Sequence, residues 1–334
     1  MHKTARSRPG NAVVFAALVL SCVALSMPRF GAAQAEDVYP SRAIRIVTPL
    51  AAGAASDVAL RILAAKLSER FGVAVIVQNQ PGGGGIIAGR AVTNAAPDGY
   101  SIAWAGNNTA ISVSLFREPL DPRQEMTPIV GVSEFAYVFV DAAASQYKTL
   151  RQWINAAREK PGTLSVGTSS AGTSNHLAAL LFKSTQKLDF TVVPYRGPSE
   201  LSVALLRNDV DLVVNAYGGL RTAIEAKQVR PLAVTSIERI SELPDVPTMK
   251  EAGVPDFEVT SWNALYGPKD VPQQAVDALA RATTEILQQP DVIAQYKAIG
   301  FEVRPIAAAA LDQRMRLEID RWANVIAQAG ISKQ

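Results

Sequence analysis

Three short loops in this sequence combine small residues with the expected start of a helix, an arrangement suited to binding anions. The loops cover residues 50–57, 80–87 and 169–176, and each follows a β-branched run. The first N–H groups of a helix have no intrahelical partner and carry about half a positive charge, and glycine or alanine lets a ligand approach them. Small residues also serve tight turns, so one loop alone would be explained by its turn. Three together predict a site for an organic anion.

The residues expected to contact this anion come from those loops and from other strand ends. Asparagine and threonine suit hydrogen bonds to a carboxylate, and Arg196 offers a bidentate partner. Asn108, Thr109 and Tyr217 also follow strands, whereas Trp104 and Trp262 are expected in the core more than in the floor of a cleft. The predicted ligand-binding residues are Leu50, Ala51, Ala52, Gly53, Asp57, Gly83, Gly84, Gly85, Asn107, Ser169, Thr173, Ser174, His176, Tyr195, Arg196 and Asn215.

His176 suggests an alternative, a serine hydrolase, because three serines lie close to it at positions 169, 170 and 174. Hydrolases commonly place the serine in Gly-x-Ser-x-Gly and supply an acid later in the chain, and Ser-Ser-Ala-Gly-Thr does not match that pattern. We therefore expect His176 to donate a hydrogen bond or to pack, and we expect no catalytic residue.

The glycine run at residues 82–85 suggests a second alternative, a nucleotide site. Gly83-x-Gly85-x-x-Ala88 has the form of the dinucleotide fingerprint, but the acid that should follow about twenty residues later is missing. No Gly-x-x-x-x-Gly-Lys occurs either. We expect no nucleotide, no other cofactor and no metal.

The elements that must position these loops alternate between strands and helices. Ser56 is predicted to cap the first helix, and Thr149 with Gln152 forms a capping box for another. Strands are predicted at 44–48, 73–77, 100–105, 129–140, 164–168, 190–195, 210–215 and 230–235, and helices at 57–71, 86–96, 150–160, 174–185, 198–207, 219–226, 273–288 and 308–329. This alternation is typical of parallel sheets with helices on both faces.

Two such α/β units, joined by the apolar stretch 129–140, predict an α/β fold of two lobes, each a mostly parallel sheet flanked by helices. Lobe 1 is predicted to comprise residues 36–138 with 258–334, and lobe 2 residues 139–257. Residues 244–272 are rich in proline and show no regular period. Solutes bind such sheets beyond the carboxyl ends of the strands, where the three loops lie.

Composition restricts the chemistry further. The chain has 334 residues with 48% hydrophobic residues, a net charge of +3, one cysteine and two histidines. That charge is too small for a nucleic-acid footprint, so no nucleic-acid partner is expected. One cysteine and two histidines leave little material for disulfides, thiolate catalysis or zinc sites.

The N-terminal 35 residues have the order of a secretory signal peptide. Lys3, Arg6 and Arg8 precede an apolar stretch at 11–27, and Ala33-Gln34-Ala35 is a small-x-small cleavage site. Alternatives are a retained membrane anchor or lipidation at Cys22, whose preceding residues match a lipoprotein box only loosely. Cleavage would leave an exported protein without cysteine, away from pools of ATP and NAD.

The sequence resembles the tripartite tricarboxylate transporter substrate-binding receptors, the TctC/Bug family of periplasmic solute-binding proteins. The resemblance runs from about Tyr39 to the end. It is carried by Tyr39-Pro-Ser-Arg-Ala-Ile-Arg-Ile-Val, Ala51-Ala-Gly-Ala-Ala-Ser-Asp57, Val77-Gln-Asn-Gln-Pro-Gly-Gly-Gly-Gly85, Ala96-Pro-Asp-Gly-Tyr100, His176-Leu, Val193-Pro-Tyr-Arg-Gly197, Leu232-Ala-Val-Thr-Ser236 and Leu243-Pro-Asp-Val-Pro-Thr248.

This resemblance implies a type II-like periplasmic-binding-protein fold that closes over an organic anion and delivers it to a tripartite tricarboxylate-type membrane permease. It implies that main-chain N–H groups of loops 50–57 and 80–87 hold a ligand carboxylate, with 169–176, 195–197 and Asn215 opposite. Leu50 stands where an aromatic residue is common, Ala54 where glycine is common, and Asn215 where aspartate is frequent. Because asparagine replaces that aspartate at position 215, the resemblance favours a di- or tricarboxylate ligand, including an aromatic one, over an amino acid.

The sequence therefore predicts a monomeric, non-enzymatic receptor of the periplasm. An exported serine hydrolase using His176 and a sensory adaptor that reports the solute to a membrane kinase are the alternatives.

Overall fold

The computed structural model describes residues 1–2 and 39–333. The predicted signal peptide, its cleavage site and Cys22 lie outside the described residues, so they stay predictions. None of the helices in the described ranges combines the length and apolar content that a membrane span requires.

The strands form a single sheet in the order β2-β1-β3-β9-β4-β7-β5-β6, and β8 and β10 also pair with β4. The strands are β1 (Ile44–Thr48), β2 (Val75–Asn79), β3 (Ser101–Gly106), β4 (Met126–Ala142), β5 (Ser165–Thr168), β6 (Thr191–Pro194), β7 (Leu212–Ala216), β8 (Val229–Val234), β9 (Thr260–Pro268) and β10 (Phe301–Ala307).

The long strand β4 divides this sheet into two halves. Its residues 126–136 pair with β9, and its residues 137–142 pair with β7 and β8. We call β1, β2, β3, β9 and β10 the first half-sheet, and β5 to β8 the second. The outer pairs in both halves are parallel, whereas every pair that involves β4 or β9 is antiparallel. The predicted α/β class is confirmed, with a mixed sheet where the halves meet.

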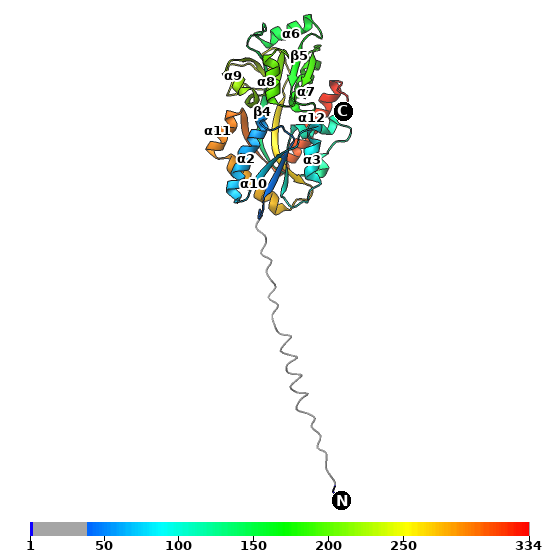
Figure 1. The fold of residues 1–334 in the computed structure, drawn as a ribbon. Helices are drawn as coiled ribbons and strands as arrows, with labels where there is room; N and C mark the ends of the chain where they lie inside the picture. Colours follow the sequence, from blue (N-terminus) through cyan, green and yellow to red (C-terminus); the bar gives the residue numbers. More distant parts are fainter. Residues whose placement is uncertain (3–38, 334) are drawn as a thin grey trace. The chain divides into compact units, whose positions relative to one another are not determined.

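The helices cover both half-sheets (Figure 1). In Figure 1, α6, α8 and α9 lie around the second half-sheet, and α2, α3 and α10 lie around the first. The helices are α2 (Ala55–Phe71), the 3-10 turn η1 (Gly83–Gly85), α3 (Ile86–Thr93), α4 (Asn107–Leu115), α5 (Pro122–Glu125), α6 (Leu150–Glu159), α7 (Ser174–Thr185), α8 (Pro198–Leu206), α9 (Tyr217–Glu225), α10 (Gln273–Leu287), α11 (Pro290–Ala298) and α12 (Ala308–Gln328).

Helix α2 shows how the sequence pattern becomes structure. Leu60, Leu63 and Leu67 recur at helical spacing and are fully buried, and the left-handed Gly72 ends the helix. The prediction that Ser56 caps this helix is wrong. Ala54, with extended backbone angles, is the N-cap, and it offers no side-chain capping bond. Ser56 therefore lies inside the first turn, with its hydroxyl free for another use.

The predicted alternation of strands and helices is confirmed in both halves, and so is the Thr149 cap, whose hydroxyl accepts a bond from Gln152 N–H. The predictions missed six elements: β9, β10, α4, α5, α11 and the 3-10 turn η1. The most consequential is β9, which lies in the centre of the sheet within a region expected to be irregular. The lobe boundaries at residues 138 and 258 stay a prediction.

Candidate ligand-binding site

Four helices begin around one cavity. Helix α2 follows β1, α4 follows β3, α7 follows β5 and α9 follows β7. Their N-cap residues, Ala54, Gly106, Thr173 and Ala216, all line the cavity, and none of them makes a side-chain capping bond to its own helix. Most of the first-turn N–H groups of the four helices thus remain available as donors, the exception being Ser174 N–H of α7, which donates to Asn108, and each helix adds about half a positive charge at that end.

The cavity is small, with a volume of about 90 Å³. This exceeds the roughly 10 to 15 Å³ that a void needs to hold one water, so the cavity has room for several waters or for a small ligand. The lining consists of Pro49, Leu50, Ala54, Ala55, Ser56, Trp104, Ala105, Gly106, Asn107, Asn108, Thr109, Phe135, Tyr137, Ser169, Thr173, Asn175, Asn215, Ala216, Ser261, Trp262 and Asn263.

Among these lining residues there is no aspartate, glutamate, lysine, arginine or histidine. A carboxylate in this cavity would be held by neutral donors alone, namely N–H groups, hydroxyls and side-chain amides. An ammonium group would meet no carboxylate partner in the lining. The electrostatics of the cavity therefore favour an anion over a zwitterion.

Gly106 allows α4 to begin directly at the end of β3. A Cβ on this residue would lie 2.0 Å from the carbonyl oxygen of Trp262 on β9, so only glycine fits between the two backbones. Because β3 pairs with β9 at this point, the N-terminus of α4 is held against the centre of the sheet.

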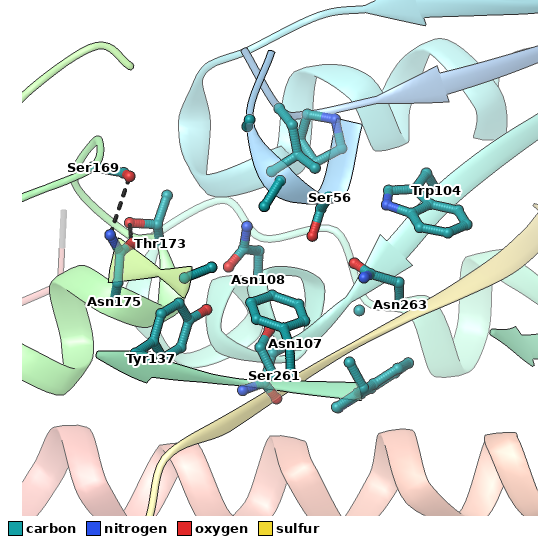
Figure 2. A pocket seen from close by; sticks show the side chains of 18 of the residues that line it. Ser56, Trp104, Asn107, Asn108, Tyr137, Ser169, Thr173, Asn175, Ser261 and Asn263 are labelled. Carbon is teal, nitrogen blue, oxygen red and sulfur yellow. Dashed lines mark hydrogen bonds between the residues drawn. The ribbon is translucent and has the colours of Figure 1, made fainter. Parts of the chain in front are cut away.

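Asn108 joins the two halves of the molecule at the cavity. Its Oδ1 accepts bonds from both the N–H (3.0 Å) and the hydroxyl (2.8 Å) of Ser174, which begins α7. With Oδ1 occupied, the Nδ2 of Asn108 is the group left to donate. Figure 2 shows this amide between the side chains of Ser56 and Tyr137.

Tyr137 lies on β4 at the point where that strand passes from the first half-sheet to the second. Burial raises the pKa of its phenol to about 12, and the nearby hydroxyls of Ser261 and Ser174 only partly oppose this shift. The phenol is therefore neutral near pH 7 and able to donate. Figure 2 shows its hydroxyl directed towards the space between the lining side chains.

A small hydrogen-bond network from the second half-sheet completes the polar wall. Asn175 Nδ2 donates to Ser169 Oγ (3.0 Å) and to the carbonyl oxygen of Val214 (2.9 Å), and Thr173 Oγ1 lies 2.7 Å from Asn175 Oδ1 (Figure 2). These bonds fix the side chains at the start of α7 before any ligand arrives.

Of the predicted site residues, the structure brings Leu50, Asn107, Ser169, Thr173 and Asn215 into the lining. Asn107 contributes little polar capacity, because its Nδ2 donates to Thr260 O and its Oδ1 accepts from Trp322 Nε1. Asn215 Oδ1 accepts from Ala216 N–H, which leaves its Nδ2 to donate.

Asp57 does not line the cavity but holds the loop that leads to α2. Its side chain is 1% exposed and accepts bonds from Gly53 N–H (2.9 Å), Arg61 Nε (2.9 Å) and Asn79 Nδ2 (2.7 Å). Burial alone would raise the pKa of Asp57, but these hydrogen bonds outweigh it and hold the pKa below its ordinary value. Asp57 is a positioning residue for the loop at 49–54.

His176 and Ser174 also lie behind the lining. The Nδ1 of buried His176 lies 3.1 Å from the Oγ1 of Thr168, so its hydrogen-bond partner is a threonine and not one of the neighbouring serines. Burial lowers the pKa of the imidazole. Ser174 is fully buried and is engaged by Asn108.

The other predicted residues lie outside the lining. Gly83, Gly84 and Gly85 form η1, and Gly85 also lines a separate void of about 10 Å³ together with Pro49 and Trp104. Arg196 is exposed, and its N–H donates to Glu200. The loop that contains Ala51, Ala52 and Gly53 approaches the loop that contains Tyr195 and Arg196, where Ala51 lies beside Gly197.

Sequence reasoning missed the part of the site that comes from β4 and β9. Phe135, Tyr137, Ser261 and Asn263 line the cavity and lie on these two crossing strands. A signal was present in Ser261 and Asn263, which occupy alternate positions of an otherwise apolar segment. Trp104 and Trp262, expected in the core, are buried and also line the cavity.

Comparison with known proteins agrees with this geometry. Residues 59–331 match the model of the tripartite tricarboxylate transporter family receptor. The chain belongs to this receptor family. It is also 36% identical over 315 residues to the UPF0065 protein of the tcbD–tcbE intergenic region of Pseudomonas sp. (strain P51), covering 93% of each chain.

Two solved structures resemble this receptor along most of its length. A Rhodopseudomonas palustris protein solved with adipate has a TM-score of 0.85 at 28% identity, covering 89% of this chain and 100% of the other. The protein MatC of the same species, solved with bound malate, has a TM-score of 0.81 at 28% identity, covering 86% of this chain and 100% of the other. Both relatives hold dicarboxylates on this fold.

Proposed function

We propose that this protein is a periplasmic receptor that captures a short di- or tricarboxylate in the cavity and delivers it to a tripartite membrane permease. The observation that carries the proposal is the convergence of four helix N-termini, none capped by the side chain of its own N-cap residue, on a cavity whose lining has no charged side chain. Such a site suits an anion because aligned N–H groups can bind negative charge without a counter-ion.

Two further observations support a carboxylate as the ligand. The cavity volume of about 90 Å³ restricts the ligand to a small molecule, which a short carboxylate is. Adipate and malate are the molecules found with the two similar structures. The lining also offers no acid that could pair with the ammonium of an amino acid.

Capture in a two-lobed receptor requires the halves to move apart and close. The contacts that would form on closure are those that join the half-sheets around the cavity, such as Asn108 with Ser174 and Ala51 beside Gly197. A ligand that binds only the closed arrangement would shift the population towards it. The crossing strands β4 and β9 are the connections about which the halves would turn.

Isothermal titration calorimetry tests the ligand class directly. We expect malate, adipate or citrate to release heat and to raise the melting temperature, whereas adipamide, which is the neutral diamide of adipate, and aspartate bind far more weakly. The receptor proposal is refuted when no carboxylate binds, or when the neutral diamide binds as tightly as the diacid.

A charge placed in the cavity provides a sharper test. Ser56→Asp adds a carboxylate in the first turn of α2, where the helix dipole favours it, so the fold should persist. Repulsion between two charges about 4 Å apart should lower the affinity for the diacid by about a hundredfold or more. Ser199→Asp is the matched control, because Ser199 is exposed in the first turn of α8 and lies outside the lining. Equal affinity of the two variants contradicts the proposed site.

Delivery is tested in cells of the source organism. Deletion of the gene should abolish uptake of the labelled diacid, and Ser56→Asp should fail to restore it. Uptake that persists while a transcriptional response to the diacid disappears would instead favour the sensory adaptor.

A further inference from the structure

Two tryptophans that line the cavity, Trp104 and Trp262, have a buried Nε1 without a hydrogen-bond partner among the described residues, and both are 2% exposed. Trp104 is the one whose indole can be followed in Figure 2. Figure 2 shows the indole nitrogen on the side of the ring that faces Ser56. Because β3 pairs with β1 and β9 on either side, the ring is mounted on a rigid part of the sheet.

The chemistry of the indole restricts what can satisfy this group. An indole N–H donates and cannot accept, so its partner must be an acceptor such as a carboxylate or carbonyl oxygen. Native proteins leave few buried donors unpaired, and an unpaired donor in a binding cavity is explained when a ligand supplies the acceptor. A ligand ammonium cannot fill this role.

The arrangement of the lining gives this donor a distinct position. In Figure 2, Trp104 and Asn263 lie at one end of the cavity, and Ser169, Thr173 and Asn175 lie at the other, with Asn108 and Tyr137 between them. At the start of α7, the Ser169 hydroxyl and the first-turn N–H groups that follow Ser174 can hold one acidic group, and Trp104 lies at the opposite end of the lining in Figure 2. The cavity thus has two polar ends.

We propose that Trp104 determines specificity by donating its Nε1–H to the second carboxylate of a short dicarboxylate. This inference rests on the proposed function and deepens it, because it assigns the ligand to diacids over monoacids and amino acids. The first carboxylate is held at the end formed by α7, and the carbon chain passes the apolar side chains of Phe135 and Leu50.

Trp104→Phe tests the assignment, because it keeps an aromatic ring and removes the donor. The ligands are the tightest-binding diacid of the series from succinate to pimelate and the monoacid of the same carbon number. Loss of a hydrogen bond to a charged group should weaken binding of the diacid about ten- to hundredfold while the monoacid is little affected. The preference for the diacid should therefore collapse.

Trp153→Phe is the matched control. The Nε1 of Trp153 is also buried without a partner among the described residues, but this ring packs against Phe182 and Phe190 and does not line the cavity. Trp153→Phe should leave both affinities at wild-type values. If both variants lost affinity for the diacid, the effect would come from a general disturbance of the fold by replacing a buried tryptophan, and the assignment would be overturned.

The wild-type protein offers a readout that needs no variant to fold. The four tryptophans give four indole N–H signals in a spectrum of protein labelled with ¹⁵N-tryptophan. Saturating diacid should move the Trp104 signal downfield, and the monoacid should not. This inference is overturned if the Trp104 signal does not move when the diacid is added, or if Trp104→Phe binds the diacid as tightly as the wild type. Either result would leave the proposed receptor function standing. Absence of any acid binding to the wild type overturns both.

Discussion

Replacing Asp57 by asparagine should weaken both the fold and the ligand site, although Asp57 does not line the cavity. The Asp57→Asn variant keeps the shape of the side chain but loses the charge that three donors share: Gly53 N–H, Arg61 Nε and Asn79 Nδ2. The bond to Gly53 fixes the loop just before Ala54, the N-cap of α2. A loosened loop would move one of the four N-termini away from the ligand.

The size of the effect follows from the exposure of each partner. A hydrogen bond to a charged, buried acceptor contributes about 1.5 to 3 kcal/mol, but asparagine retains part of this through its own Oδ1. The Arg61 side chain is 49% exposed, so solvent screening limits its ion pair to about 1 kcal/mol or less. We therefore expect Asp57→Asn to lower the free energy of unfolding by about 2 to 3 kcal/mol, which is a decrease in melting temperature of about 4 to 10 °C.

Urea unfolding of the two proteins at neutral and acidic pH measures this effect. The folded-state pKa of Asp57 lies below its ordinary value of 3.8, so its stabilising contribution is present above that value and is lost as the pH falls through the lower folded-state pKa. The difference between wild type and variant should therefore shrink in acid. Arg61→Gln is the comparison and should cost about 1 kcal/mol or less. A smaller loss for Asp57→Asn than for Arg61→Gln would refute the reasoning.

Two further variants test the elements around the cavity. Gly106→Ala places a Cβ 2.0 Å from Trp262 O, so it should lower the free energy of unfolding by about 1 to 3 kcal/mol and weaken diacid binding. Gly197→Ala is the control, because its Cβ would have its nearest contact at 3.9 Å, and denaturant titrations should show little change in its stability. Burial depresses the pKa of His176 below 6.5, so the unfolded chain takes up a proton that the folded chain resists, and stability should fall as the pH drops from 6.5 towards the lower folded-state pKa. His176→Gln should lack this decline in melting curves recorded against pH; an unchanged decline would assign it to other groups.

Much of the fold follows from local pattern. The βα repeats were predictable because helical spacing of leucines, as in α2, and short β-branched runs, as in β1, agree with the elements that form. The start of helix α6 was predictable from Thr149, whose hydroxyl accepts the Gln152 N–H of the first turn, while the Gln152 side chain accepts from Lys148 N–H just before the N-cap.

The centre of the sheet was not predictable in the same way. Strand β9 mixes strand formers with asparagine, glycine and proline, and it follows a proline-rich region, so its local preference for a strand is ambiguous. Strand β9 is stabilised by backbone hydrogen bonds to β3 on one side and β4 on the other, and the local sequence does not predict this pairing. Helix α4 was missed because Asn107-Asn108-Thr109 is typical of a turn, yet these residues directly follow the N-cap.

The same distinction separates the predicted and missed parts of the site. Leu50, Ser169 and Thr173 follow parallel strands and Asn215 lies at the end of β7, where topology places ligand contacts. Tyr137 lies in the interior of a strand instead, and its contact with the cavity depends on where β4 passes between the half-sheets. That crossing is a property of tertiary pairing, which no local pattern specifies.

A cavity lined by neutral donors also suits a receptor that must release what it binds. A buried arginine would need a counter-ion whenever the cavity is empty, and a fully buried ion pair with the ligand would be costly to separate. Helix N-termini carry only partial charge, and their N–H groups tolerate water when no ligand is present. In this protein the full charges lie outside the lining, as in the Asp57–Arg61 pair that shapes the loop before α2. Rigid, uncharged contacts can thus select a carboxylate without holding it irreversibly.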